Sequence, residues 1–328
     1  MKAWIAPVLC LFFLLLASAA SIAYGSREND LREVIDVLRG GGDAHLQQVL
    51  AARWPRTVVG ATVGASLAVS GVIIQGLTRN PLGEPGLLGV TTGASAAVVT
   101  AVAFFGFSAT VGPATVLVAL PGAIVVVVLV YVLSRSSGSQ SVVPLILAGA
   151  VVSAVLTAYI QAMVLTQPQV FDSYRHWVVG SLAGAQFETL WAVLPAVILG
   201  LLLAVILAPG LNTLALGDEV AVSLGAPVVA IRAGGILAAT LLAAAATAAV
   251  GPIAFIGLAA PHLVRSLVGG DFRQQVPVAI LLGASLLLAS DVVARVIARP
   301  EELMVGVVTA FLGAPFLLVA VRRGKVAV

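Results

Sequence analysis

Few residues in this sequence have the types and spacing that catalysis requires. The histidines His45, His176 and His262 fall in or near three separate loops, and none has a partner at metal-ligand spacing. The only Gly-Lys pair, Gly324-Lys325, is not part of a G-x-x-x-x-G-K-S/T phosphate-binding loop. We therefore predict that the chain is not an enzyme, holds no metal or cofactor of its own, and cannot hydrolyse ATP alone.

Two other classes of membrane protein would need buried ionisable groups. An ion-coupled secondary transporter keeps such groups near the middle of the bilayer, and an intramembrane hydrolase needs a Ser or Asp facing a buried His or a second Asp. No apolar run has a charge near its centre, and His262 has no evident partner. Gln75 and Gln161 are the notable polar residues inside the runs, and hydrogen bonding between helices is favoured over pore lining. Both classes are therefore less favoured than a transporter driven from outside the chain.

The composition shows what elements must position these residues. Of the 328 residues 60% are apolar and 9% are charged, and the mean hydropathy is +1.13. Charge-free runs recur at about the ~20 residues that a helix needs to cross ~30 Å of hydrocarbon. The lone cysteine, Cys10, lies inside the first run, so one chain can form no disulfide. The net charge of +3 is dispersed, which argues against nucleic-acid binding.

The pattern predicts an all-α integral membrane protein with about ten transmembrane helices in a single domain, residues 1–328. The first run has the length of a full span, which favours a span over a cleaved signal peptide. Only Val250-Gly251-Pro252 separates the seventh run from the eighth, and we expect a tight turn there. The runs fall at 3–24, 57–78, 86–106, 112–133, 142–165, 187–209, 229–249, 251–269, 276–297 and 303–321.

Basic residues near the span ends predict the orientation. Arg322, Arg323 and Lys325 follow the last run, and Arg135 and Arg273 lie in loops on the same side. With an even number of spans, both termini are expected in the cytoplasm.

Two segments are expected on the outer face. Residues 26–50 have helical apolar spacing and predict a short amphipathic helix. Residues 166–186 include Trp177, which we expect to anchor the chain at the membrane boundary.

Several motifs interrupt this pattern with Arg, Pro and Gly. Arg53-x-Pro-Arg56 precedes the second run, and an RNPL-x-x-PG-x-LG turn follows it at 79–89. A GPIAFIGL-x-x-PH-x-x-R segment at 251–265 would be unusual in a lipid-exposed helix, because it holds two prolines. Asp291-x-x-x-Arg295 and a G-x-x-TA-x-x-G-x-PF segment follow.

Together these motifs resemble, nearly end to end, the permease subunit of binding-protein-dependent ABC importers for iron-siderophores, haem and cobalamin. Residues inside them that we expect to have structural roles are Gln75, Arg79, Asn80, Pro81, Gly86, Gly251, Pro252, Gly257, Pro261, His262 and Arg265.

This resemblance implies a type II ABC importer permease in the bacterial cytoplasmic (inner) membrane. Two ten-helix subunits, identical or paralogous, would surround a central pathway. Two ATPase subunits, which hold the ATP-Mg, would bind on the cytoplasmic side. A periplasmic or lipid-anchored substrate-binding protein would dock outside.

The resemblance also assigns candidate sites. Arg53, Arg56 and Arg295 match arginines that pair with acidic residues of the binding protein, although snorkelling arginines are the alternative from the residues alone. A loop resembling the segment that contacts the ATPase holds Leu216, Gly217, Asp218, Glu219, Leu224 and Gly225. The inner gate is expected near Gln140, Ser141, Val142 and Val143, with Gln161 further along the pathway.

Ferric siderophore is the favoured substrate, because Tyr174-Arg175-His176-Trp177-x-x-Gly180-Ser181-Leu182 resembles the outer segment of siderophore permeases. Haem comes second. His176 could then be a transient iron ligand, although an interfacial histidine is the more common case. Cobalamin comes third.

Overall fold

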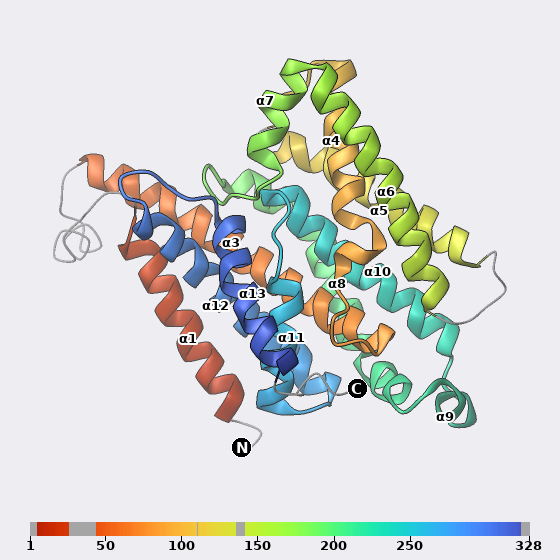
Figure 1. Cartoon of the computed structure of the whole chain (residues 1–328). Coiled ribbons are helices and arrows are strands. Elements are labelled where there is room, and N and C mark those ends of the chain that lie inside the picture. Colours follow the sequence, from red (N-terminus) through yellow and green to blue (C-terminus); the bar gives the residue numbers. More distant parts are fainter. Residues whose placement is uncertain (1–4, 26–43, 110, 136–141, 323–328) are drawn as a thin grey trace.

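The computed structural model describes residues 5–25, 44–109, 111–135 and 142–322, and every regular element among them is a helix (Figure 1). In chain order the elements are α1 (Ile5–Ala23), α3 (Ala44–Thr78), the 3-10 helix η1 (Pro85–Leu88), α4 (Val90–Phe105), α5 (Pro113–Arg135), α6 (Val143–Thr166), α7 (Pro168–Trp177), α8 (Phe187–Ala215), α9 (Asp218–Ser223), α10 (Val228–Val250), α11 (Ile256–Val268), α12 (Phe272–Ile297) and α13 (Val305–Arg322).

Each of the ten predicted runs overlaps one α-helix. Seven helices in the described part of the chain, α1, α3, α5, α6, α8, α10 and α12, are long and apolar enough to cross a membrane. The other three runs form the shorter apolar helices α4, α11 and α13. The prediction of an all-helical integral membrane protein is confirmed.

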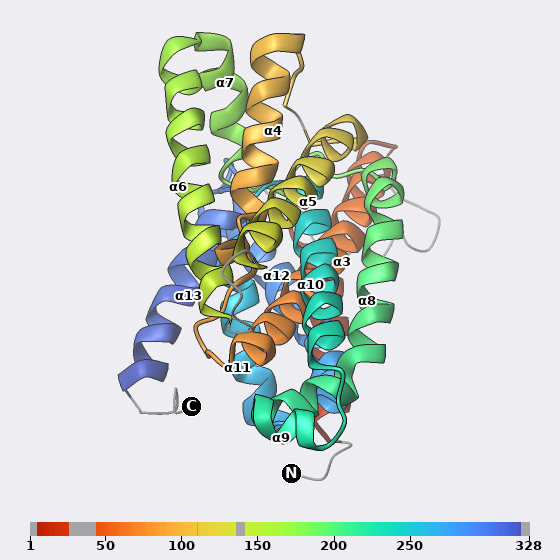
Figure 2. The ribbon, with the colours of Figure 1, turned by 90° about the vertical axis from the view of Figure 1, so that its right-hand side faces the viewer.

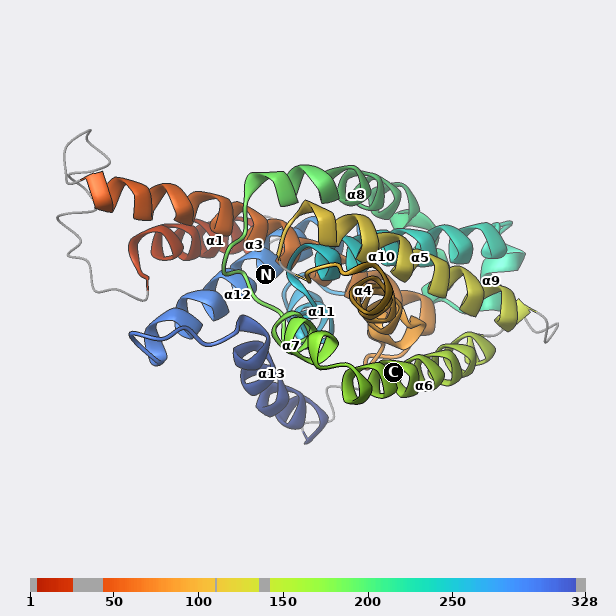
Figure 3. The same cartoon turned by 90° about the horizontal axis from the view of Figure 1, so that it is seen from above.

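Helix α3 forms the centre of the bundle. Its 35 residues extend about 52 Å, well beyond the thickness of the hydrocarbon core. In its apolar window 83% of the residues are buried inside the protein, against 17% for α1 at the edge of the bundle. It packs against α8, α10, α11 and α12, while α6 and α8 lie on opposite sides of α10 (Figures 2 and 3).

Helix α3 begins at Ala44, 13 residues before the apolar run expected at 57–78. The additional turns include Pro55 and both arginines of the R-x-P-R motif. A proline inside a helix removes one backbone hydrogen bond. The arginine contacts described below fasten these turns to α1 and α12.

Glycines allow α3 to approach its neighbours at backbone distance. A Cβ added at Gly64 would overlap the carbonyl oxygen of Gly283 in α12, and one at Gly71 would overlap that of Gly257 in α11. Ser70 donates to the carbonyl of Ala239 in α10 at 2.7 Å. Small residues therefore allow α3 to pack closely against three neighbouring helices.

The turn expected at 250–252 is longer than predicted. Gly251 has φ +82° and Phe255 has φ +70°, so α11 begins only at Ile256 and spans 13 residues, about 20 Å. A Cβ at Gly251 would overlap the carbonyl oxygen of Trp177, and Pro252 makes the same close approach to Gly180. This non-helical stretch is tolerated because protein, not lipid, surrounds it.

The two ends of the bundle differ in their short helices. Helix α7 lies at one end, called here the α7 end (Figures 1 and 2). Helix α9, the start of α1 and the end of α13 lie toward the other, the α9 end. This arrangement agrees with an even number of spans.

Two expectations for the outer segments need correction. Trp177 is only 4% exposed and packs in the core, so it does not anchor the chain at an interface. Of the amphipathic helix expected at 26–50, residues 26–43 lie outside the described residues, and 44–50 belong to α3.

Candidate docking and coupling sites

Charged side chains gather at both ends of α3. At the α7 end, Arg53, Arg56, Asp291, Arg295 and Glu302 form what we call the Arg56 cluster. At the α9 end, Arg79, Asp218 and Arg232 form the Asp218 cluster. One helix therefore connects the two groups.

The Arg56 cluster is built around a buried carboxylate. Arg56 donates through Nε and Nη2 to Asp291 at 3.1 and 2.8 Å, a two-pronged arrangement of high geometric specificity. Arg295, one helical turn beyond Asp291 on α12, adds a third contact at 2.8 Å. The Asp291 side chain is only 1% exposed, so its charge is compensated by these two arginines rather than by water.

Arg53 and Arg295 also fasten α1 to the bundle. Arg53 Nη1 donates to the carbonyls of Ile22 and Ala23 at 2.8 and 2.9 Å. Arg295 Nη1 donates to those of Ser21 and Tyr24, each at 2.9 Å. The last carbonyls of a helix lack intrahelical donors, and arginine side chains satisfy them here.

Two of these arginines are buried within the chain, since Arg295 is 1% exposed and Arg53 is 7% exposed. Their guanidinium groups bind the chain's own carbonyls and carboxylate, which a lipid-snorkelling arginine would not do. Contact of any of the three arginines with a binding protein stays a prediction.

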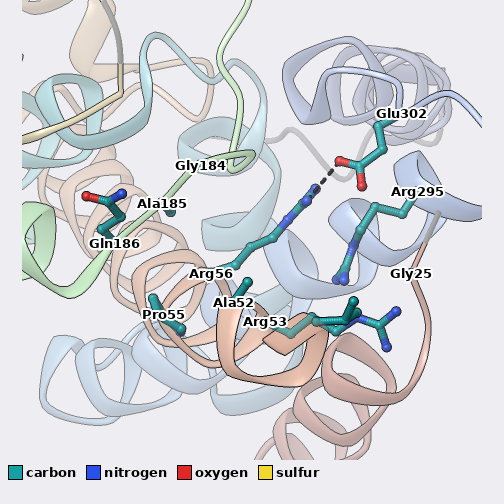
Figure 4. Close-up of a pocket in the computed structure, with 11 residues that line it drawn as sticks. Gly25, Ala52, Arg53, Pro55, Arg56, Gly184, Ala185, Gln186, Arg295 and Glu302 are labelled. Atoms are coloured by element: carbon teal, nitrogen blue, oxygen red, sulfur yellow. Dashed lines mark hydrogen bonds and ion pairs between the residues drawn. The ribbon is translucent and has the colours of Figure 1, made fainter. Parts of the chain in front are cut away.

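A hollow of about 540 Å³ opens beside this cluster (Figure 4). Arg53, Arg56 and Glu302 line it together with Gly184 and Gln186 of the segment before α8. Glu302 accepts from Arg56 Nη1 at 2.8 Å across its edge. Both charges of an ion pair therefore line the hollow.

The Asp218 cluster ties the short helix α9 to two long helices. Arg79, at the end of α3, donates through Nη2 to one oxygen of Asp218 and through Nε to the carbonyl of Leu214 at 3.0 Å. Arg232 of α10 donates to the other oxygen of Asp218 at 2.5 Å. Asp218 follows Gly217, whose φ of +113° favours glycine. A single carboxylate therefore fixes the start of α9.

The rest of this loop presents an apolar surface. Leu216 and Leu224 are 62% and 64% exposed, and Val220 is 46% exposed, whereas Ala221 faces the protein. Glu219 is exposed, and Gly225 closes the helix at φ +75°. From the sequence, Asp218 and Glu219 were expected to have the same role. In the structure, Asp218 contacts two arginines, whereas Glu219 is exposed.

The RNPL turn lies next to this loop, and side chains hydrogen-bond to its backbone. Asn80 accepts from the amide of Leu82 at 2.9 Å through Oδ1. His262 Nε2 lies 2.9 Å from the carbonyl oxygen of Pro81, which supplies the partner that the sequence left unidentified. Glu84 is half-buried, and burial raises the pKa of its carboxyl.

Other motif residues have packing roles. Gln75 is 2% exposed and donates to the carbonyl of Leu258 at 3.2 Å, which confirms hydrogen bonding between helices. Pro261 is buried in α11, while Arg265 is exposed in its last turn, where a cation suits the helix dipole. Gly86 lies in η1, and a Cβ there would approach nothing closer than 3.9 Å.

The gate prediction is only partly within the described residues. Gln140 and Ser141 lie outside them. Val142 immediately precedes α6, Val143 is 60% exposed, and Gln161 is exposed on the same helix. Their role in a pathway stays a prediction.

The sequence missed two charged residues of these clusters. Glu302 lies beside Glu301 between two apolar runs, and nothing in the sequence separates the two acids. Arg232 is the fourth residue of the expected run 229–249. A cation just inside an apolar run was a usable signal, because such a position normally requires a partner.

The fold defines a class, that of polytopic integral membrane proteins. A model of the FecCD transport family matches residues 11–323 of the chain. The ferric enterobactin transport system permease protein FepD of Escherichia coli (strain K12) is 42% identical over 315 residues, which are 95% of this chain and 93% of FepD. The hemin transport system permease protein HmuU of Yersinia pestis is 38% identical over 83% of this chain and 82% of HmuU.

A solved structure gives the same result. A transporter assigned to the metal-chelate type of ABC transporters, in an inward-facing conformation, matches with a TM-score of 0.84 at 29% identity, over 97% of this chain and 98% of the other. The chain belongs to the FecCD transport family. It is accordingly a permease of the ABC importer type, as its motifs predicted.

Proposed function

We propose that this chain is the membrane-spanning subunit of an ATP-driven importer for a ferric siderophore. A binding protein delivers the iron chelate at the α7 end, and two ATPase subunits bind at the α9 end. The observation that carries this proposal is α3 itself, because it connects the Arg56 cluster to the helix that resembles the family's ATPase contact. The 42% identity to a ferric enterobactin permease favours the substrate class.

The apolar surface of Leu216, Val220 and Leu224 supports the ATPase contact. Exposed apolar patches rimmed by polar groups are typical of protein interfaces. The bound ATP-Mg belongs to the ATPase subunits, and this chain contributes no cofactor. The α9 end is then cytoplasmic and holds both termini, the membrane is the bacterial inner membrane, and a second permease subunit completes the pathway.

Haem is a second candidate substrate. His176 lines a hollow of about 630 Å³ at the α7 end, together with Asp172 and Ser181. An imidazole there could contact a haem iron in transit, and the similarity to a hemin permease points the same way.

The test is uptake into vesicles that hold this chain with its ATPase subunits and binding protein, with ATP present or withheld. ATP-dependent uptake of iron-loaded siderophore alone is the expected result. ATP-dependent uptake of haem or cobalamin instead would support the same mechanism with a different substrate. Uptake that follows an ion gradient and ignores ATP would refute the proposal.

A further inference from the structure

Arg56 divides its donors between two carboxylates of different accessibility. Nε and Nη2 donate to Asp291, whose side chain is 1% exposed. Nη1 points into the hollow and donates to Glu302, whose side chain is 29% exposed (Figure 4). Only the Nη1 contact can be exchanged from outside. A carboxylate of a partner could reach Nη1 through the hollow, but it could not reach the buried face of the guanidinium.

Glu302 is placed so that it can leave. It lies between α12 and α13, in a stretch with no helix. The amide of Leu303 is held by the carbonyl of Ala294 at 3.1 Å, and that of Gly306 by Gly180 at 3.3 Å. The backbone on the α13 side of Glu302 is thus held by hydrogen bonds that do not involve Arg56, so exchange of the contact between Arg56 and Glu302 leaves this segment folded.

We propose that Glu302 is an internal substitute for a partner carboxylate, which holds Arg56 between docking events and is displaced when the acidic surface of the binding protein arrives. This inference rests on the proposed function. Docking then exchanges one ion pair for another instead of pairing a bare arginine. Because the exchange returns little net energy, the partner can be released after each cycle.

The experiment compares Glu302→Gln with Glu301→Gln in the complete transporter. Both variants remove one negative charge from the same exposed loop, but the part of the chain that the structure describes pairs only Glu302 with Arg56. The probe is the binding protein that restores uptake in the vesicle experiment, and the readout is its Kd for the transporter in lipid discs.

Relative to Glu301→Gln, we expect Glu302→Gln to lower the Kd by about twofold to fivefold, the factor that corresponds to freeing one exposed pair. Glu302→Asp, with a shorter side chain, should shift the Kd in the same direction by less, and it serves if the Gln variant fails to fold. An unchanged or raised Kd for Glu302→Gln would overturn the inference. If no binding protein restores uptake or binds the unmodified transporter, the proposed function fails instead.

Discussion

The two ends of α3 carry ion pairs of opposite character. At the α7 end, Asp291 is buried and forms ion pairs with two arginines. Removal of either charge in such a pair would leave an unpaired charge in the protein interior. At the α9 end, Asp218 is 41% exposed and Arg79 is 39% exposed, so water can replace either partner. The difference indicates that the first cluster holds the fold together, whereas the second only sets the position of a short surface helix.

The largest expected effect follows from breaking the buried cluster. Asp291→Asn leaves Arg56 and Arg295 facing a neutral amide in a buried site, and loss of such a partner costs about 3–5 kcal/mol. We expect the midpoint of thermal unfolding in detergent to fall by about 10 °C. Asp172→Asn is the matched control, since its 66% exposed side chain pairs with Arg175 at the surface and its loss should change the midpoint little. Equal shifts for the two variants would contradict a structural role for the Arg56 cluster.

The connection between the two ends depends on the packing of α3 in the middle. Gly71→Ala would push a methyl group into the carbonyl of Gly257, and overpacking of this kind costs about 1–3 kcal/mol. We expect the unfolding midpoint to fall by roughly 5 °C. Gly86→Ala adds the same methyl group where the nearest atom is 3.9 Å away, so it should be close to neutral. A neutral Gly71→Ala would mean that α3 and α11 can separate, and that α3 is not a rigid link.

The exposed cluster should affect transport more than stability. Asp218→Asn removes the charged acceptor for both Arg79, which is 39% exposed, and Arg232, which is 14% exposed. The docked position of α9 then loses about 1–2 kcal/mol, while the packing of the long helices is untouched. We expect substrate transported per ATP hydrolysed to fall by up to about tenfold, with little change in the unfolding midpoint. Glu219→Gln, at the neighbouring exposed position, is the control for loss of a charge at the proposed ATPase contact. If Glu219→Gln lowers this ratio as much, the charge acts on the partner and not on the position of α9.

The same comparison shows what the sequence could predict. Hydropathy located the ten apolar helices, because a segment that crosses lipid must be helical and predominantly apolar. Motif resemblance found Arg53, Arg56, Arg295 and the α9 loop. It did not show that Arg295 is buried, since that depends on the carbonyls at the end of α1, about 270 residues away in the chain. Nor could it distinguish Asp218 from Glu219. Neighbouring helix residues point in different directions, and the docking of the helix decides which of them faces the protein.

Substitution of Glu84 has the smallest expected effect. Unlike Asp291, which contacts two arginines, Glu84 forms no ion pair among the described residues, although it lies in the same turn as Arg79. Burial alone raises its pKa above the ordinary 4.5. Below that ordinary value the carboxyl is protonated in both folded and unfolded chains and costs nothing. As pH rises from that ordinary value toward the raised pKa, the unfolded chain ionises this carboxyl while the folded chain still holds its proton, so the stability of the folded state falls and then stays reduced above the raised pKa. Glu84→Gln should therefore raise the unfolding midpoint by about 2 °C near pH 8 and leave it unchanged near pH 4. The exposed Glu301→Gln should give no such pH-dependent gain, and a loss of stability in Glu84→Gln at about pH 8 would mean that the ionised carboxylate has a favourable partner in the assembled transporter.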